Sequence, residues 1–255
     1  MTPLDQAHAA MEAAPENDAA RLHFYERLAD AELFLLLTEE VTADRLSPSI
    51  FDTSDGRFAL AFDREERLTA FTEGPAPYAA LSGRAIATLL AGQGIGLGLN
   101  LGVAPSAFLV PADALGWLSD TLQSGPEEFE ERPEEIAPPA GLPERLVTGL
   151  DTKLASARGL AQMAYLVAVT YPGGRPGHML AFIAPTPGAE PALAKAISEV
   201  LVFSGVEAGT LDVAFFAPTD PIAAKLAKHG LRFDLPQIET AKPPGSDPTK
   251  PPRLR

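Results

Sequence analysis

The stretch "AGQGIGLGLNLG", residues 91–102, decides how the first half of the chain folds. It holds five glycines and lies inside a run, Ala85 to Val110, that has no charged side chain. Within it an aliphatic set, Ile95, Leu97, Leu99 and Leu101, alternates with a small or polar set, Gly94, Gly96, Gly98 and Asn100. A period of two residues is typical of a β-strand. We therefore expect residues 95–101 to form a strand with one aliphatic face and one face of bare backbone.

The bare face of this strand leaves two alternatives open. Glycine is unfavourable in strands unless something approaches the backbone closely. The approaching group is either another element of the same protein, such as a helix packed hard on the sheet, or a ligand or partner segment. Under the second alternative the binding residues are Gly94, Gly96, Gly98 and Asn100, whose amide supplies both a donor and an acceptor.

Two nucleotide-binding interpretations of the glycines do not fit the residues present. A dinucleotide-binding fingerprint needs the third glycine of G-x-G-x-x-G, and counting from Gly94 that position is Leu99. A P-loop needs a Lys after its last glycine, and no Lys is near. A membrane-spanning helix is disfavoured by the glycines, by Gln93 and by Pro105. We therefore expect no nucleotide cofactor and no membrane span.

The residues around this strand predict both helices and strands. Thr2, followed by a proline, predicts the start of a helix, and Asn17 or Asp18 caps a second one. Asp63 and Glu66 have the spacing of a capping box for the helix that follows them. Strands are expected at 33–37, 57–63 and 106–110, helices at 64–73, 83–93 and 111–123, and a loop at 74–81.

Composition changes after residue 125. The stretch "GPEEFEERPEEIAPPAGLP", residues 125–143, has six glutamates and five prolines, which is typical of an exposed linker. Residues 143–236 then show the order helix, strand, strand, helix, strand, helix, strand, and the proline-rich residues 237–255 are expected to be disordered. The predicted fold is α+β, with two α/β-sandwich-like domains with mixed sheets at 1–125 and 143–236. An acidic, Pro-rich linker at 126–142 joins them.

Charge and cysteine content exclude several classes of function. The 255-residue chain has a formal net charge of −14, which repels phosphate backbones, so no nucleic-acid partner is expected. The chain has no cysteine, which excludes disulfides, thiolate metal sites and Cys nucleophiles. The opening "MTPLDQAHAAMEAAPEND" lacks the basic and apolar regions of a secretory signal. A cytoplasmic location of the bacterial type is therefore expected.

Three stretches of the first half carry a resemblance to a known family. They are "RFALAFDREERLTAF", "GPAPYAALSGRAIATLLAG" and "GIGLGLNLG", and together they resemble the N-terminal domain of the SseB family. In that family a helix leads into an aliphatic strand that ends at an Asn, as at Asn100 here. The family's Asn is often followed by Pro, whereas Leu101 follows here. Residues 143–236, with "AYLVAVTY", "GHMLAFI" and "DVAFFAPTDPIAAKL", resemble the SseB C-terminal domain.

The resemblance implies little chemistry. The family name is attached to an enhanced serine-sensitivity phenotype, and it is also borne by a secreted translocon component of type III secretion. A translocon protein is expected to show long coiled-coil heptads or clear membrane segments. This sequence shows neither pattern, so we set the secretion function aside.

Candidate catalytic groups are few. No pair of the four histidines has metal-ligand spacing on one helix face, and no G-x-S-x-G motif occurs, so no metal is expected and no catalytic residue is assigned. Tyr171, Arg175 and His178 lie around a predicted hairpin loop and are candidates for an anion site, the alternative being a polar loop. Asp212, inside the apolar stretch "LDVAFF", either marks a site or faces solvent at a sheet edge.

These features favour a non-catalytic binding or regulatory protein of the SseB type that acts through protein–protein contacts. Its partner is either an unknown protein or a second copy of the chain, and no cofactor is expected. The alternative is an enzyme whose site assembles from scattered polar residues without a metal or nucleotide cofactor. A deep pocket with converging polar groups would favour the enzyme, and a shallow apolar patch the binding protein.

Overall fold

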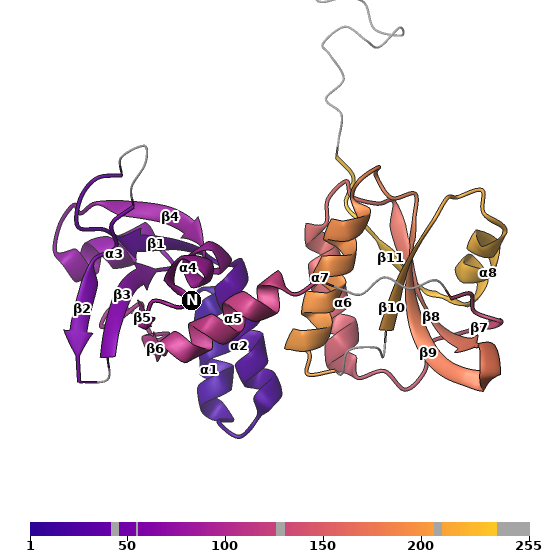
Figure 1. Ribbon diagram of the computed structural model, residues 1–255, viewed down its shortest axis with the longest axis horizontal. Helices are drawn as coiled ribbons and strands as arrows, with labels where there is room; N and C mark the ends of the chain where they lie inside the picture. Colours follow the sequence, from indigo (N-terminus) through magenta and orange to yellow (C-terminus); the bar gives the residue numbers. More distant parts are fainter. Residues whose placement is uncertain (42–45, 55, 126–130, 207–210, 239–255) are drawn as a thin grey trace, which may run out of the picture. The chain divides into compact units, whose positions relative to one another are not determined.

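The chain forms two compact units, each with its own sheet (Figure 1). The computed structural model of the protein describes residues 1–41, 46–54, 56–125, 131–206 and 211–238. The first unit comprises Met1–Glu128 with Ser198–Ala208, and the second Phe129–Ile197 with Gly209–Arg255. Both sheets are mixed and carry helices, so the fold is α+β, as predicted.

Among the described residues, the first unit contains a six-stranded mixed sheet. Its elements in chain order are α1 (Pro3–Ala13), α2 (Asp18–Asp30), β1 (Glu32–Leu36), β2 (Ile50–Thr53), β3 (Gly56–Phe62), α3 (Glu65–Thr72), β4 (Tyr78–Ser82), α4 (Gly83–Leu90), β5 (Ile95–Leu99), β6 (Phe108–Val110) and α5 (Ala112–Gln123). The strand order is β4-β1-β3-β5-β6, and β2 pairs with β3. β3 and β5 are parallel, whereas the other pairs are antiparallel.

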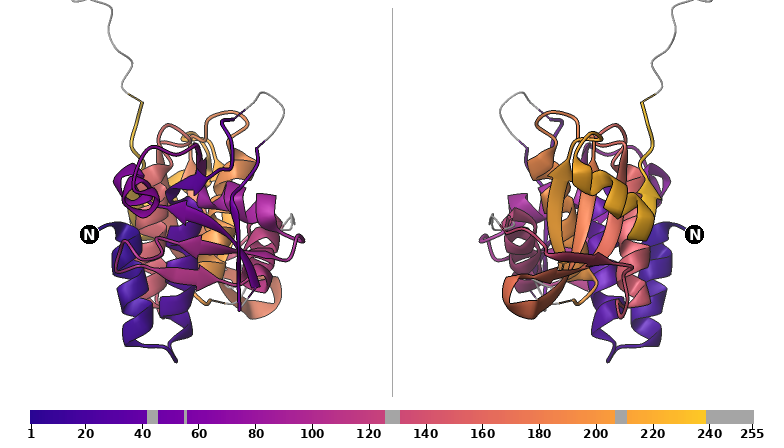
Figure 2. Two further views of the ribbon diagram at one scale, coloured as in Figure 1. Left: turned by 90° about the vertical axis from the view of Figure 1, so that its left-hand side faces the viewer. Right: turned by 90° about the vertical axis from the view of Figure 1, so that its right-hand side faces the viewer.

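Both faces of this sheet are covered by helices (Figure 2, left). Neighbouring residues of a strand point to opposite faces, so Leu35 lies in the main core and Leu36 in a smaller one. The main core joins one face of the sheet to apolar side chains of α1, α2, α4 and α5. The smaller core joins the other face to α3 through Leu68.

Three details of the first unit differ from the sequence prediction. β4 lies within the segment predicted as a loop at 74–81 and pairs with β1 along its whole length. β2 is not among the predicted strands, and it pairs with the first half of β3. β5 ends at Leu99 instead of residue 101, because Asn100 adopts the left-handed backbone conformation with a φ of 51°.

Among the described residues, the second unit contains a five-stranded mixed sheet. Its elements are β7 (Glu135–Ala137), α6 (Glu144–Ser156), β8 (Met163–Tyr171), β9 (Arg175–Ile183), the first part of α7 (Glu190–Phe203), β10 (Leu211–Phe216), α8 (Pro221–His229) and β11 (Leu231–Asp234). The residues of α7 from Ser198 onward belong to the first unit. The strand order is β10-β9-β8-β11, and β7 also pairs with β8. Only the β9–β10 pair is parallel among these described strands.

From α6 to β11, the second unit follows the predicted order of helices and strands. Figure 1 shows α6 and α7 on one side of its sheet and α8 on the other (see also Figure 2, right). Leu226 of α8 packs on the face formed by alternate residues of β8 and β9, such as Val167 and Ala181. On α6, leucines at spacing four, Leu146, Leu150 and Leu154, are buried, as the helical period requires.

The segment predicted as a linker is only partly described. Of residues 126–142, those at 126–130 lie outside the described residues. Glu135–Ala137 form β7 and pair with β8, so this part of the segment adds a short strand to the sheet. Of the predicted tail at 237–255, residues 239–255 lie outside the described residues. The boundaries of the two predicted domains therefore stay predictions.

Candidate functional site

The residues predicted to bind a ligand fall in two places. The three glycines and Asn100 belong to the first unit, whereas Tyr171, Arg175 and His178 belong to the second. Each group is therefore a separate candidate site.

In the first unit, side chains of β3 cover the glycines of β5. In the parallel β3–β5 pair, Gly96 lies opposite Phe58 and Gly98 opposite Leu60. A Cβ atom added to Gly96 would lie 2.5 Å from the Phe58 ring and 2.6 Å from the carbonyl oxygen of Val110. One added to Gly98 would lie 2.5 Å from Leu60 Cδ2. Side chains of the same sheet, and not a helix, fill the bare face, which leaves no open groove at these two positions.

Gly94 does not share this environment. It precedes β5, has a φ of 64°, and a Cβ atom built there would have no neighbour within 4 Å. A positive φ favours glycine because other residues clash there, so the turn between α4 and β5 accounts for Gly94. Gly94 therefore does not belong to the bare strand face to which the sequence pattern assigned it.

Asn100 lies in the protein interior. Its side chain is fully buried. Its Oδ1 accepts a hydrogen bond from the Asp63 backbone N–H at 3.1 Å, and its Nδ2 donates to Ser106 Oγ at 2.9 Å. Asn is among the few residues that tolerate the left-handed conformation, so one residue both ends β5 and joins a polar network.

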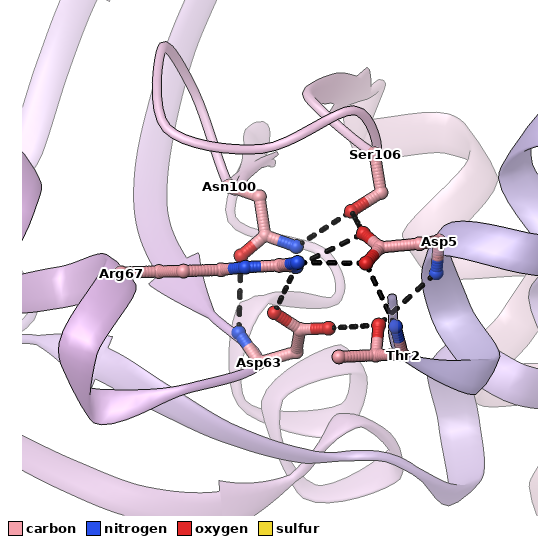
Figure 3. Close-up of polar contacts among 6 residues, drawn as sticks. All are labelled: Thr2, Asp5, Asp63, Arg67, Asn100 and Ser106. Carbon is pink, nitrogen blue, oxygen red and sulfur yellow. Dashed lines mark hydrogen bonds and ion pairs between the residues drawn. The ribbon is translucent and has the colours of Figure 1, made fainter.

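An arginine between two carboxylates forms the centre of this network (Figure 3). Arg67 on α3 donates two hydrogen bonds to Asp5 on α1, from Nη1 to Oδ1 at 2.9 Å and from Nη2 to Oδ2 at 2.7 Å. Its Nη1 also donates to Asp63 Oδ1 at 2.7 Å. The side chains of Asp5 and Asp63 are 0% and 4% exposed, and that of Arg67 is 15% exposed. This is a bidentate, almost fully desolvated ion pair with a second carboxylate attached.

Hydroxyl and backbone groups complete the network. The Asp5 carboxylate also accepts from the Thr2 backbone N–H at 2.8 Å and from Ser106 Oγ at 2.5 Å. The Thr2 hydroxyl donates to Asp63 Oδ2 at 2.6 Å, as Figure 3 shows. Each oxygen of the two carboxylates therefore has at least one donor, as buried charges require.

The charges of the network are held in their ionised forms. The hydrogen bonds from Arg67, against the opposing effect of burial, place the pKa of the Asp5 carboxyl far below its usual range. The hydrogen bond to Asp5 in turn raises the pKa of Arg67. A general acid or base works best with a pKa near the operating pH. Asp5 and Arg67 do not meet this condition, so the network suits a structural role better than proton transfer.

The sequence prediction assigned Asp63 to a different role. The expected capping box of Asp63 and Glu66 is wrong, because α3 begins at Glu65 after Arg64, and no side-chain hydrogen bond caps it. Asp63 instead accepts from Arg67, four residues on, and from Thr2. The spacing of Asp63 and Arg67 was a readable signal for an ion pair. The position of Asp5, three residues after Thr2, signals a capping box, and nothing local pairs Asp5 with Arg67.

In the second unit, Tyr171 and Arg175 lie directly opposite each other in the β8–β9 pair. The guanidinium carbon of Arg175 lies 4.4 Å from the centre of the Tyr171 ring, and Arg175 also forms an ion pair with Glu131. The Tyr171 hydroxyl donates to Asp212 Oδ2 at 2.5 Å. Burial and this hydrogen bond raise the pKa of the Tyr171 hydroxyl. The nearby carboxylates already balance Arg175, which weakens the case for an added anion.

His178 lies apart from the other two residues. It is three positions after Arg175 on β9, and side chains at odd spacing in a strand point to opposite faces. Its Nε2 lies 3.0 Å from the carbonyl oxygen of Ala140. The structure thus brings Tyr171, Arg175 and Asp212 together and leaves His178 on the other face.

The described residues offer neither a metal site of histidines and carboxylates nor a membrane-spanning helix. Within residues 1–41, 46–54, 56–125, 131–206 and 211–238, no group of three or more histidines or carboxylates could hold a metal ion. In the same residues, no helix combines the length and the apolar character that a membrane crossing needs.

Comparison with known families matches the first unit. Residues 4–117 match the family model of the SseB protein N-terminal domain. The first unit therefore contains an SseB protein N-terminal domain. Comparisons with curated proteins and with solved structures give no significant match.

The SseB N-terminal domain contains nearly all of the buried network. Asp5, Asp63, Arg67, Asn100 and Ser106 lie within the matched residues, and Thr2 lies just before them. The resemblance of residues 143–236 to the SseB C-terminal domain lies beyond the match and stays a prediction.

Proposed function

We propose that this SseB-family chain is a non-catalytic binding or regulatory protein that acts through protein–protein contacts. One observation supports the proposal: the charged groups of both candidate sites are paired with each other. Arg67 is held by two carboxylates in the first unit, and Arg175 and Tyr171 by Glu131 and Asp212 in the second. In the first unit this pairing holds the pKa values of Asp5 and Arg67 far from neutral pH, where a general acid or base works best.

In this proposal the two polar clusters stabilise the fold, and the protein surface binds the partner. The network ties α1 to α3 and to the segment after β5 through Asp5, Arg67 and Ser106. A rigid scaffold lowers the entropy lost when a partner binds. The predicted cytoplasmic location belongs to the same proposal.

The experiment measures partner binding and the turnover of small molecules with the same protein preparation. The purified full chain is cross-linked in an extract of its source, partners are identified by mass spectrometry, and each purified partner is titrated by calorimetry. We expect saturable binding and no consumption of small molecules in a metabolite mixture followed by NMR. Turnover that is lost in Arg175→Met, whose side chain is exposed, would overturn the proposal in favour of an enzyme.

A further inference from the structure

One strand of the first unit has an edge that no other described strand covers, and it carries exposed apolar side chains. β2 pairs with β3 from Ile50↔Ala59 to Thr53↔Gly56, and no described strand pairs with its other side. Figure 1 shows β2 as the outer strand of this hairpin. The backbone N–H and C=O groups along such an edge are a template for a further strand.

Exposed apolar side chains are concentrated on this edge. The exposed large apolar residues of the described chain are Met1, Val41, Ile50, Phe51, Trp117, Leu231 and Ile238. Among them only Ile50 and Phe51, which are 37% and 39% exposed, share a strand. Because neighbours in a strand point to opposite faces, an added strand would find one apolar side chain on each face.

Phe51 is held in place by other rings. It lies opposite Phe58 in the β2–β3 pair, and its ring meets Phe71 of α3 edge to face, with centroids 6.4 Å apart. A ring that is already ordered loses little entropy on binding. The edge is thus pre-organised on the face that carries Phe51.

The acidic charge around β2 favours a basic partner. Residues 1–125 contain 18 acidic side chains, seven arginines and no lysine. Asp52 on β2 is exposed and lies opposite Arg57 of β3, and Glu39 and Glu40 in the segment that precedes β2 are exposed as well. A second copy of the chain would carry the same net charge of −14 and would be repelled, whereas a basic partner would be attracted.

We propose that the free edge of β2 binds an extended segment of a partner protein in which apolar residues alternate with lysine or arginine. The segment adds a strand to β2, with its apolar side chains on the face that carries Phe51 and its basic side chains on the opposite face, near Asp52 and its acidic neighbours. This inference rests on the proposed function and names the surface and the chemistry of the partner.

The probe is a labelled octapeptide of alternating lysine and valine with blocked ends, titrated against the full chain by fluorescence anisotropy. The control probe has glutamate in place of each lysine. We expect the lysine peptide to bind at least roughly tenfold more tightly than the glutamate peptide. Its affinity falls as salt is raised from about 50 to about 300 mM, because salt screens the acidic surface.

A pair of matched variants locates the site. The double variant Ile50→Lys with Phe51→Lys is compared with Leu231→Lys with Ile238→Lys, which changes two other exposed residues in the same way. We expect the first variant to lose at least roughly tenfold in affinity for the lysine peptide and the second to bind as before. If the first variant does not fold, hydrogen exchange of the unaltered chain, with and without the lysine peptide, locates the binding site. We expect the peptide to slow exchange at residues 50–53.

Four results would overturn the inference: equal binding of both peptides, unchanged binding by the first variant, protection away from β2, or self-association through β2. A protein partner cross-linked at another surface would overturn this inference and leave the proposed function standing. Substrate turnover lost in Arg175→Met would overturn the proposed function whichever peptide binds.

Discussion

At the scale of single residues, the pairing of Asp5 with Arg67 dominates the first unit. The Asp5 side chain has no exposed surface, so its charge depends on the donors around it for compensation. A buried ion pair adds little over an apolar pair of the same shape, but the loss of one member leaves a charge without compensation. Single substitutions in the network should therefore cost far more than those of exposed charges.

Arg67→Met tests this asymmetry. The variant leaves Asp5 and Asp63 buried without their cation, and we expect the free energy of unfolding to fall by about 3–5 kcal/mol. The measurement is urea denaturation followed by circular dichroism. Arg64→Met, three residues earlier and exposed, is the control and should change stability by less than about 0.5 kcal/mol. Similar values for the two variants would contradict a structural role of the network.

Asp5 also makes stability depend on pH. Its pKa is lowered in the folded protein by the hydrogen bonds from Arg67, so the folded state binds the proton less readily than the unfolded state. The contribution is fully present above the unfolded pKa of about 3.9 and is lost as pH falls below it toward the lower folded value. We expect Asp5→Asn to flatten the acid limb of the unfolding free energy measured between about pH 6 and pH 3. Asp52→Asn, at an exposed site, should leave that limb unchanged, and a change of equal size there would refute this account.

At the scale of elements, side chains of β3 cover the glycines of β5. Phe58 and Leu60 cover Gly96 and Gly98, so large residues on one strand face residues without a side chain on the next. This pairing fills the face while keeping the parallel strands in register.

Gly96→Val should overpack this face. Its Cβ atom would lie 2.6 Å from the backbone oxygen of Val110, which cannot move as easily as a side chain. We expect thermal or urea unfolding to show a loss of about 1–3 kcal/mol. Gly116→Ala in α5, where a Cβ atom meets nothing within 4 Å, is the control and should stabilise by about 0.5–1 kcal/mol. If Gly96→Val were as stable as the unaltered chain, the Phe58 ring and the Val110 backbone would have to move aside for the added side chain.

At the scale of the whole molecule, the chain is two compact units with separate sheets and separate polar clusters. The predicted break between them lies in the stretch rich in glutamate and proline. β7 adds one part of this stretch to the second sheet, which should protect residues 135–137 relative to those before them.

Limited digestion with a glutamate-specific protease tests the predicted domain break. We expect the first cuts at the glutamates between residues 126 and 134, because this stretch has the composition of a linker. Mass spectrometry identifies the fragments, and digestion of the urea-unfolded chain shows which sites are intrinsically cleavable. A resistant fragment that runs intact through 110–160 would contradict the break.

Much of the fold could be predicted from local pattern alone. The alternation from Ile95 to Leu99 predicted β5. Thr2 and Asn17, one of the two residues expected to cap the second helix, are helix caps. The order of elements from α6 to β11 also followed from the sequence. These features depend on residues that are near neighbours in the chain, where hydrophobic period and capping chemistry act directly.

The candidate sites depended on the tertiary structure. Thr2 and Asp63 are 61 residues apart, and Ser106 and Asp5 are 101 apart, so no local spacing encodes their hydrogen bonds. β4 forms where a loop was predicted because β1 supplies its partner backbone. The separation of His178 from Arg175 was readable from the strand period, but the carboxylates of Glu131 and Asp212 reach Arg175 and Tyr171 only through folding. Local sequence determined most of the helices and strands, whereas β2, β4 and β7 formed against partner strands that only the fold supplies. The tertiary structure also decided which polar groups meet, because a buried charge is stable only beside a compensating partner.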